Sequence, residues 1–182
     1  SYYNGFGGYL RRGTTSGSTG DIYRELLRGD IGFATSTLLV ERGCLDDVGL
    51  WDESLDSNID FDLCLRISQR YRFEYIDEPL LISHDHTGAR VTTNKTAKFE
   101  GLEQIIDKWG AEMEAEFGFS YRETFRQQYV AGVYRDIALW HARNGRRRHA
   151  IHELQNHLHY SDSIDSKFGL LFGLSFMSPT LH

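Results

Sequence analysis

Apolar residues recur at helical spacing through the second half of the chain. Three series follow intervals of three or four residues: Phe99, Leu102, Ile106, Trp109 and Met113; Phe125, Tyr129, Val133, Ile137 and Trp140; and Ala150, Ile151, Leu154 and Leu158. Such spacing places each series on one face of a helix. Asn94 is suited to cap the first helix. Asn144-Gly145 ends the second, so residues 121–160 are predicted to form an αα-hairpin.

The pattern in residues 18–93 is that of short mixed elements. Helices are predicted over residues 20–28, 41–48 and 58–71, and strands over residues 33–40 and around Phe73 and Tyr75. Gly29 and Gly49 are placed to end the first two helices, and Asn58 to cap the third. The first part of the chain is thus expected to hold short helices and strands in alternation.

Composition excludes several classes of protein. Hydrophobic residues make up 40% and charged residues 25% of the 182 residues, which is ordinary for a folded domain. The net charge of −6 argues against nucleic-acid binding. Cys44 and Cys64 lie in apolar stretches and are expected to be reduced thiols. No apolar run reaches the roughly 18 residues that a membrane span needs. We expect a cytoplasmic protein, and peripheral membrane association through residues 168–177 stays open.

Five motifs follow one another between residues 21 and 93. They are Asp21-Ile22-Tyr23-Arg24-Glu25-Leu26-Leu27-Arg28-Gly29-Asp30, Thr35-Ser36-Thr37-Leu38-Leu39-Val40, Val48-Gly49-Leu50-Trp51-Asp52-Glu53-Ser54-Leu55, Asp60-Phe61-Asp62-Leu63-Cys64-Leu65-Arg66, and Glu78-Pro79-Leu80 followed by His86. In this order and spacing they resemble the family 2 glycosyltransferases, which have the GT-A fold.

The resemblance implies an α/β fold with a mixed sheet. Residues 1–117 would be the C-terminal part of a GT-A glycosyltransferase domain. Residues 118–182 would be a helical tail, made of the αα-hairpin and an apolar C-terminal segment. The composition changes near Gly118, which sets this boundary. The apolar stripe of the hairpin, from Phe125 to Trp140, is expected to pack back on residues 1–117, because an uncovered stripe would be a large exposed patch.

The resemblance also implies the activity. It implies an inverting glycosyltransferase that moves a sugar from a nucleotide-sugar donor to the hydroxyl of a carbohydrate or lipid-linked acceptor, with a divalent metal, Mg²⁺ or Mn²⁺, in the complete enzyme. Two departures qualify this expectation. Ile59 stands where the family has Glu, and no Asp-x-Asp metal motif precedes these elements. We therefore expect the chain to carry the acceptor side alone, without the donor half, and to be inactive by itself. The alternative is a non-catalytic glycosyltransferase-like module for binding or assembly.

Asp60 occupies the position of the family's catalytic base. A carboxylate in reach of the acceptor hydroxyl could take its proton as the oxygen attacks the sugar. The start of the predicted helix would keep Asp60 ionised. The alternative is that Asp60 only stabilises the first helical turn.

Other candidates in the first half are predicted to bind substrate. Asp62 would orient the loop or bind an acceptor hydroxyl, although its spacing to Arg66 favours an i,i+4 ion pair. Trp51, with Asp52 and Glu53 in the same turn, could offer its indole ring to a sugar, or could belong to the edge of the core.

The segment that follows is predicted to approach the donor. The resemblance places His86 near the diphosphate or its metal, and Arg90 could meet a phosphate. The pair His84-x-His86 does not define a metal site by itself, because two ligands are too few.

Overall fold

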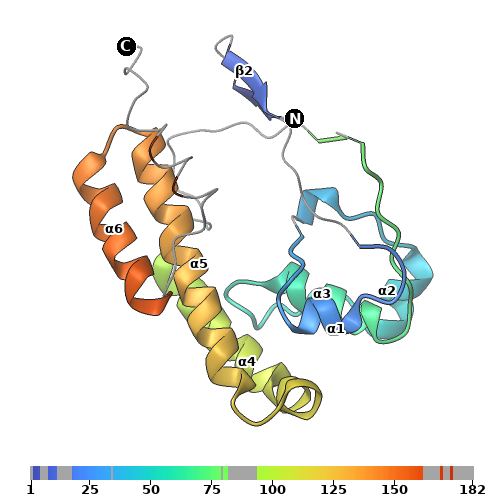
Figure 1. The fold of residues 1–182 in the computed structure, drawn as a ribbon. Helices are drawn as coiled ribbons and strands as arrows, with labels where there is room; N and C mark the ends of the chain where they lie inside the picture. The colour runs from blue at the N-terminus through green and yellow to red at the C-terminus, as the bar shows by residue number, and fades with distance from the viewer. Residues whose placement is uncertain are drawn as a thin grey trace.

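The computed structural model describes residues 2–4, 8–11, 18–33, 35–78, 80–81 and 94–161, together with Gly169 and Gly173. The helices in this part are α1 (Tyr23–Leu27), α2 (Arg42–Val48), α3 (Ile59–Ser68), α4 (Lys95–Phe117), α5 (Tyr121–Arg143) and α6 (Arg147–Tyr160). In Figure 1, α1, α2 and α3 lie together on one side of the molecule, and α5 and α6 run side by side on the other.

The predicted α/β fold with a mixed sheet is wrong. The only sheet among the described residues is an antiparallel pair of short strands, β1 (Tyr2–Asn4) and β2 (Gly8–Arg11). Residues 33–40 contain a short 3₁₀ helix, Thr35–Thr37, in place of a strand. Phe73 makes a single antiparallel bridge with Gly20. A strand needs a neighbour for its backbone N–H and C=O groups, and the described residues offer residues 33–40 none.

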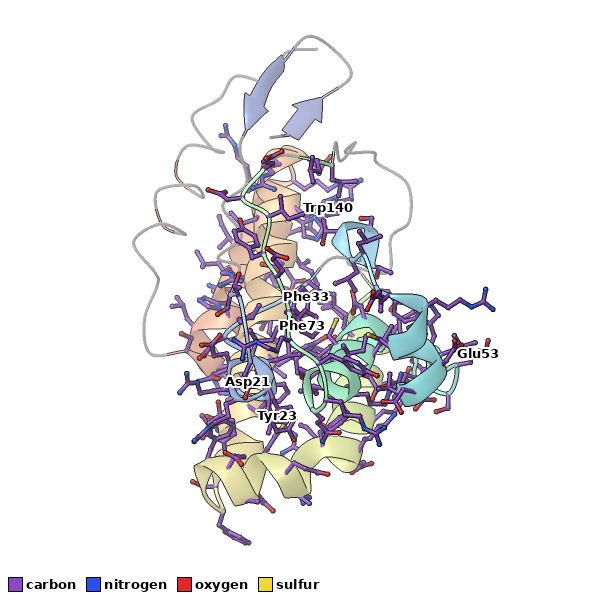
Figure 2. The ribbon with its side chains drawn as sticks, turned by 90° about the vertical axis from the view of Figure 1, so that its right-hand side faces the viewer. Asp21, Tyr23, Phe33, Glu53, Phe73 and Trp140 are labelled. Atoms are coloured by element: carbon purple, nitrogen blue, oxygen red, sulfur yellow. The ribbon has the colours of Figure 1, made fainter. Side chains whose placement is uncertain are left out.

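Three apolar residues of the two expected strands still reach the core, whereas Leu39 and Tyr75 are exposed. The rings of Phe33 and Phe73 stack at a centroid distance of 5.7 Å, and Figure 2 shows the two side chains next to each other. Leu38 also packs against the core. Burial of these side chains accounts for the strand-like pattern, because apolar alternation reports a buried face and cannot report a hydrogen-bonded partner strand.

The prediction of three long helices in the second half is confirmed. Asn94 caps α4, where its side-chain oxygen accepts a hydrogen bond from the Ala97 N–H at 3.3 Å. Helices α5 and α6 form the predicted αα-hairpin (Figure 1). His157 on α6 lies 2.9 Å from the backbone carbonyl of Ala131 on α5 through its Nδ1 atom. Gly145 follows α5 with a left-handed φ of 70°, which suits the tight stop predicted there.

Three short helices are also confirmed, although α1 and α3 are shorter than predicted. Gly29 follows α1 with a φ of 78°, and Gly49 follows α2 with a φ of 86°. The predicted capping role of Asn58 is wrong. Asn58 directly precedes α3, but its side chain makes no hydrogen bond to the helix N–H groups. Its amide is used elsewhere, as described below.

The core joins the first part of the chain to the start of the hairpin. Its buried residues come from α1 and the positions that flank it, and from α3, α4 and α5: Ile22, Leu26, Leu27, Ile31, Cys64, Leu65, Leu102, Ile105, Ile106, Trp109, Met113 and Phe125. Helix α4 approaches the residues before α3 closely at Gly101, since a Cβ atom there would overlap the Ser57 side chain. Phe125 meets Phe61 of α3 with ring centroids 6.1 Å apart.

The apolar stripe of α5 has two destinations. Phe125 and Tyr129 pack against the core of the first part, as predicted. Val133 and Ile137 are buried farther along α5, where α6 runs beside it. Trp140 is half-buried near the end of α5, with the Arg146 guanidinium 4.9 Å from its ring centroid. Phe125 and Tyr129 are therefore the residues of the stripe that join the core cluster of the first part.

Candidate functional site

A cavity of about 260 Å³ opens where the segment that follows α1 (residues 28–33), the start of α3, α4 and the start of α5 meet. Its lining combines carboxylate, amide and aromatic groups: Arg28, Gly29, Ile31, Gly32, Phe33, Asn58, Asp60, Phe61, Leu102, Ile105, Phe125, Gln128 and Tyr129. We call this cavity the Asp60 pocket. It brings together residues that are up to about one hundred positions apart in the sequence.

Asp60 lies on the wall of this pocket, in the first turn of α3. One carboxylate oxygen accepts a hydrogen bond from the Thr35 hydroxyl at 3.0 Å. The other accepts from the backbone N–H of Phe61 at 2.9 Å, which is one of the N–H groups that the start of a helix leaves without a partner. The side chain is half-buried. Among the described residues, no Lys, Arg or His side chain forms an ion pair with it.

Asp62, two residues farther along α3, is fully buried and forms ion pairs. Its carboxylate accepts hydrogen bonds from Arg66 Nε at 2.9 Å and from Trp109 Nε1 at 2.9 Å. Lys108 Nζ lies 2.8 Å from it. The i,i+4 ion pair with Arg66 that the spacing predicted is confirmed. A buried charge requires such partners, so the structure gives Asp62 a place inside the protein and no contact with the pocket.

Asp52, in the turn at residues 51–53, is linked to Asp62 because both carboxylates form an ion pair with Lys108. Asp52 Oδ2 lies 2.6 Å from Lys108 Nζ, and its Oδ1 accepts hydrogen bonds from the N–H and hydroxyl of Ser54. The Lys108 ammonium, followed by the Ser54 groups, holds the pKa of the Asp52 carboxyl well below its usual range. Trp51 is 40% exposed. Glu53 is exposed as well, and Figure 2 places it at the outer edge of the molecule, away from Phe33.

None of these three turn residues lines the Asp60 pocket. Of the predicted substrate-binding residues that the structure describes, it therefore brings neither Asp62 nor residues 51–53 to the Asp60 pocket. Arg66 helps to hold the turn on α3, because its guanidinium donates hydrogen bonds to the backbone carbonyls of Val48 and Leu50 at 2.7 and 2.8 Å.

The residues predicted to approach the donor, His86 and Arg90, lie outside the described residues. Within the part of the chain that the structure describes, no group of three or more His, Cys, Asp or Glu side chains is arranged to hold a metal ion. The described residues thus do not form the metal site that the resemblance implies.

Two neighbours of Asp60 were not identified from the sequence pattern. Asn58 adopts a left-handed conformation with φ 61° and ψ 24°, and Tyr129 of α5 donates a hydrogen bond from its hydroxyl to Asn58 Oδ1 at 2.8 Å. Burial raises the pKa of Tyr129, and the charge of Asp60 adds to the increase. The hydroxyl of a Tyr in an otherwise apolar stripe is a signal for such a contact, since a buried tyrosine hydroxyl usually finds a partner.

Cys64 is the thiol nearest in sequence to the site. Burial raises its pKa to about 12, and the negative charge of Asp60 contributes. The thiol is therefore protonated near neutral pH and is a core residue. Both cysteines are free and buried, as expected from the sequence.

The comparisons with known proteins leave the family unassigned. No protein-family model, curated protein or solved structure matches this chain. Among the described residues, no helix has both the length and the apolar character that crossing a membrane requires.

Proposed function

We propose that this chain supplies the acceptor side and the catalytic base of an inverting glycosyltransferase that uses a nucleotide-sugar donor. The observation that carries the proposal is the position and hydrogen bonding of the Asp60 carboxylate. Its carboxylate lies on the wall of a pocket, forms no ion pair with the described residues, and is oriented by Thr35 and by the start of α3. A general base needs this combination of access and fixed orientation.

The lining of the Asp60 pocket suits a sugar ring. Asp60 and Gln128 offer groups that hydrogen-bond hydroxyls, while Phe33 and Phe61 offer apolar surface to the C–H face of a ring. Such a combination of mostly apolar walls and a few polar groups is typical of small-molecule sites. The cavity of about 260 Å³ lies just below the roughly 300–1,000 Å³ of sites for drug-sized ligands, so it suits a single sugar ring.

The proposed reaction is a single displacement. The acceptor oxygen attacks the anomeric carbon of the donor sugar while Asp60 takes the proton of that hydroxyl. The bond from the anomeric carbon to the diphosphate oxygen breaks, and the nucleoside diphosphate leaves with the bonding electrons.

This proposal assigns only the acceptor side to the described residues. The nucleotide sugar, and the Mg²⁺ or Mn²⁺ expected with it, would be bound by residues outside the described part. When bound, the metal would neutralise charge on the leaving diphosphate.

The test is turnover by the complete gene product that contains residues 1–182. Transfer from a panel of uridine and guanosine diphosphate sugars to simple glycosides is measured for the wild type and for Asp60→Asn. Loss of the base should lower kcat by about 10²–10⁴. Asp56→Asn is the matched control, because Asp56 is exposed, contacts Gln104 and lies outside the pocket. Wild-type turnover by Asp60→Asn would instead favour the non-catalytic binding or assembly module.

A further inference from the structure

One wall of the Asp60 pocket comes from the helical hairpin. Phe125, Gln128 and Tyr129 of α5 line the pocket opposite residues of the first part of the chain. Gln128 is exposed, and within the described part of the chain its amide makes no hydrogen bond to another residue. Its side chain can donate two hydrogen bonds and accept others. An unpaired amide on the wall of a polar and aromatic pocket is available to a ligand.

The neighbouring Tyr129 contacts the site in a different way. Its hydroxyl donates to Asn58 Oδ1 at 2.8 Å, and the Asn58 amide donates to Ser57 Oγ at 3.2 Å. Asn58 has the left-handed backbone that non-glycine residues seldom adopt. Ser57, in turn, lies directly against Gly101 of α4. The backbone that enters α3 is thus held from α5 and α4, two residues before Asp60.

We propose that α5 is the acceptor-selecting wall of the site. Gln128 hydrogen-bonds an acceptor hydroxyl next to the one that reacts, and Tyr129 is a positioning residue that holds Asp60 through Asn58. This inference rests on the proposed function and deepens it. It makes the hairpin a part of the site, whereas the sequence pattern suggested a separate tail.

The role of Gln128 is tested by acceptor kinetics of the complete gene product. Gln128→Ala should raise the KM for the acceptor about tenfold, since a lost hydrogen bond of about 1.4 kcal/mol corresponds to that factor. Its kcat should stay within about twofold of the wild type, because the base is untouched. Gln127→Ala is the control: this neighbour is exposed and bonds Glu123, away from the pocket. A set of acceptors that each lack one hydroxyl identifies the hydroxyl that Gln128 binds. One of them should bind the wild type more weakly than the parent acceptor does, whereas Gln128→Ala should bind this acceptor and the parent acceptor equally.

The role of Tyr129 is tested by the same kinetics, with a loss in kcat expected in place of an increase in KM. Tyr129→Phe keeps the ring and removes the hydroxyl, so kcat should fall about tenfold while the acceptor KM changes little. Asn58→Gly, which tolerates the left-handed backbone, should cause the same loss, and the double variant should be no worse than either. Tyr134→Phe is the control on the same helix, since the Tyr134 ring stacks on Tyr160, a residue of α6. A role in folding alone would lower the melting temperature and leave kcat per folded molecule intact.

The outcomes separate this inference from the proposed function. If Asp60→Asn keeps the wild-type kcat, the proposed function fails, and the α5 inference fails with it. If Asp60→Asn loses turnover while Gln128→Ala and Tyr129→Phe behave like their controls, the proposed function stands and the α5 inference is overturned.

Discussion

Asp60 and Asp62 are separated by one residue in the first turn of α3, yet they lie in opposite surroundings. Asp60 faces a pocket, is half-buried, and has hydrogen bonds from a hydroxyl and a backbone N–H. Asp62 has no exposed surface and bonds Arg66, Lys108 and Trp109. The comparison shows that two carboxylates in one motif can have different environments. Asp62 forms buried ion pairs, whereas Asp60 lies on the wall of a pocket without an ion pair to the described residues.

Substitution in the ion pairs of Asp62 with Arg66 and Lys108 should lower the free energy of unfolding more than substitution of Asp60 does. Asp62→Asn removes the negative charge and leaves Arg66 and Lys108 facing a neutral group. We expect a loss of about 3–5 kcal/mol in the free energy of unfolding, the usual cost of removing one partner of a buried ion pair. Urea unfolding of this chain measures it. A loss below about 1 kcal/mol would mean that the cluster is not an important source of stability.

The pocket side of α3 depends on aromatic packing. Phe125→Ala should cost about 3–5 kcal/mol, because Phe125 is buried against Phe61. Trp140→Ala should cost only about 1–2 kcal/mol, since Trp140 is half-buried beside Arg146 and buries less apolar area. The same urea experiment compares the two variants. Equal losses would show that the hairpin is anchored along its whole length.

Acid should lower the stability that the Asp52–Lys108 ion pair contributes. Its pKa is lowered in the folded state, mainly by Lys108, so its contribution to stability is complete above the unfolded-state pKa of about 3.9. That contribution is lost as the pH falls toward the folded-state pKa. The stability difference between the wild type and Asp52→Asn should therefore be constant near neutral pH and shrink below about pH 4.

Local patterns predicted the helical part of this molecule well. Each of the three series between Phe99 and Leu158 depends only on the spacing of residues within its own helix. The Asp62–Arg66 pair likewise lies within α3. The strand predicted at residues 33–40 is wrong, because a strand requires a partner that the local pattern does not specify.

The site was predictable in part. Asp60 is a candidate from its motif, its role as the base stays a prediction, and the structure places its side chain on the wall of a pocket. The far wall of that pocket was not predictable, because the Asn58–Tyr129 hydrogen bond joins residues 71 positions apart. The roles of Asp52 and Asp62 also depend on Lys108 and Trp109, which belong to a different helix. Contacts of this kind are set by packing, and no spacing rule within one segment reports them.

The most direct test of this account measures kcat and the free energy of unfolding on the same two variants, Asp60→Asn and Asp62→Asn, in the complete gene product. We expect Asp60→Asn to lose about 10²–10⁴ in kcat but only about 0.3–1 kcal/mol in stability. Asp62→Asn should show the reverse, with a large loss of stability and kcat per folded molecule close to the wild type. An Asp60→Asn variant that keeps more than about a tenth of the wild-type kcat would contradict the assignment of Asp60 as the base.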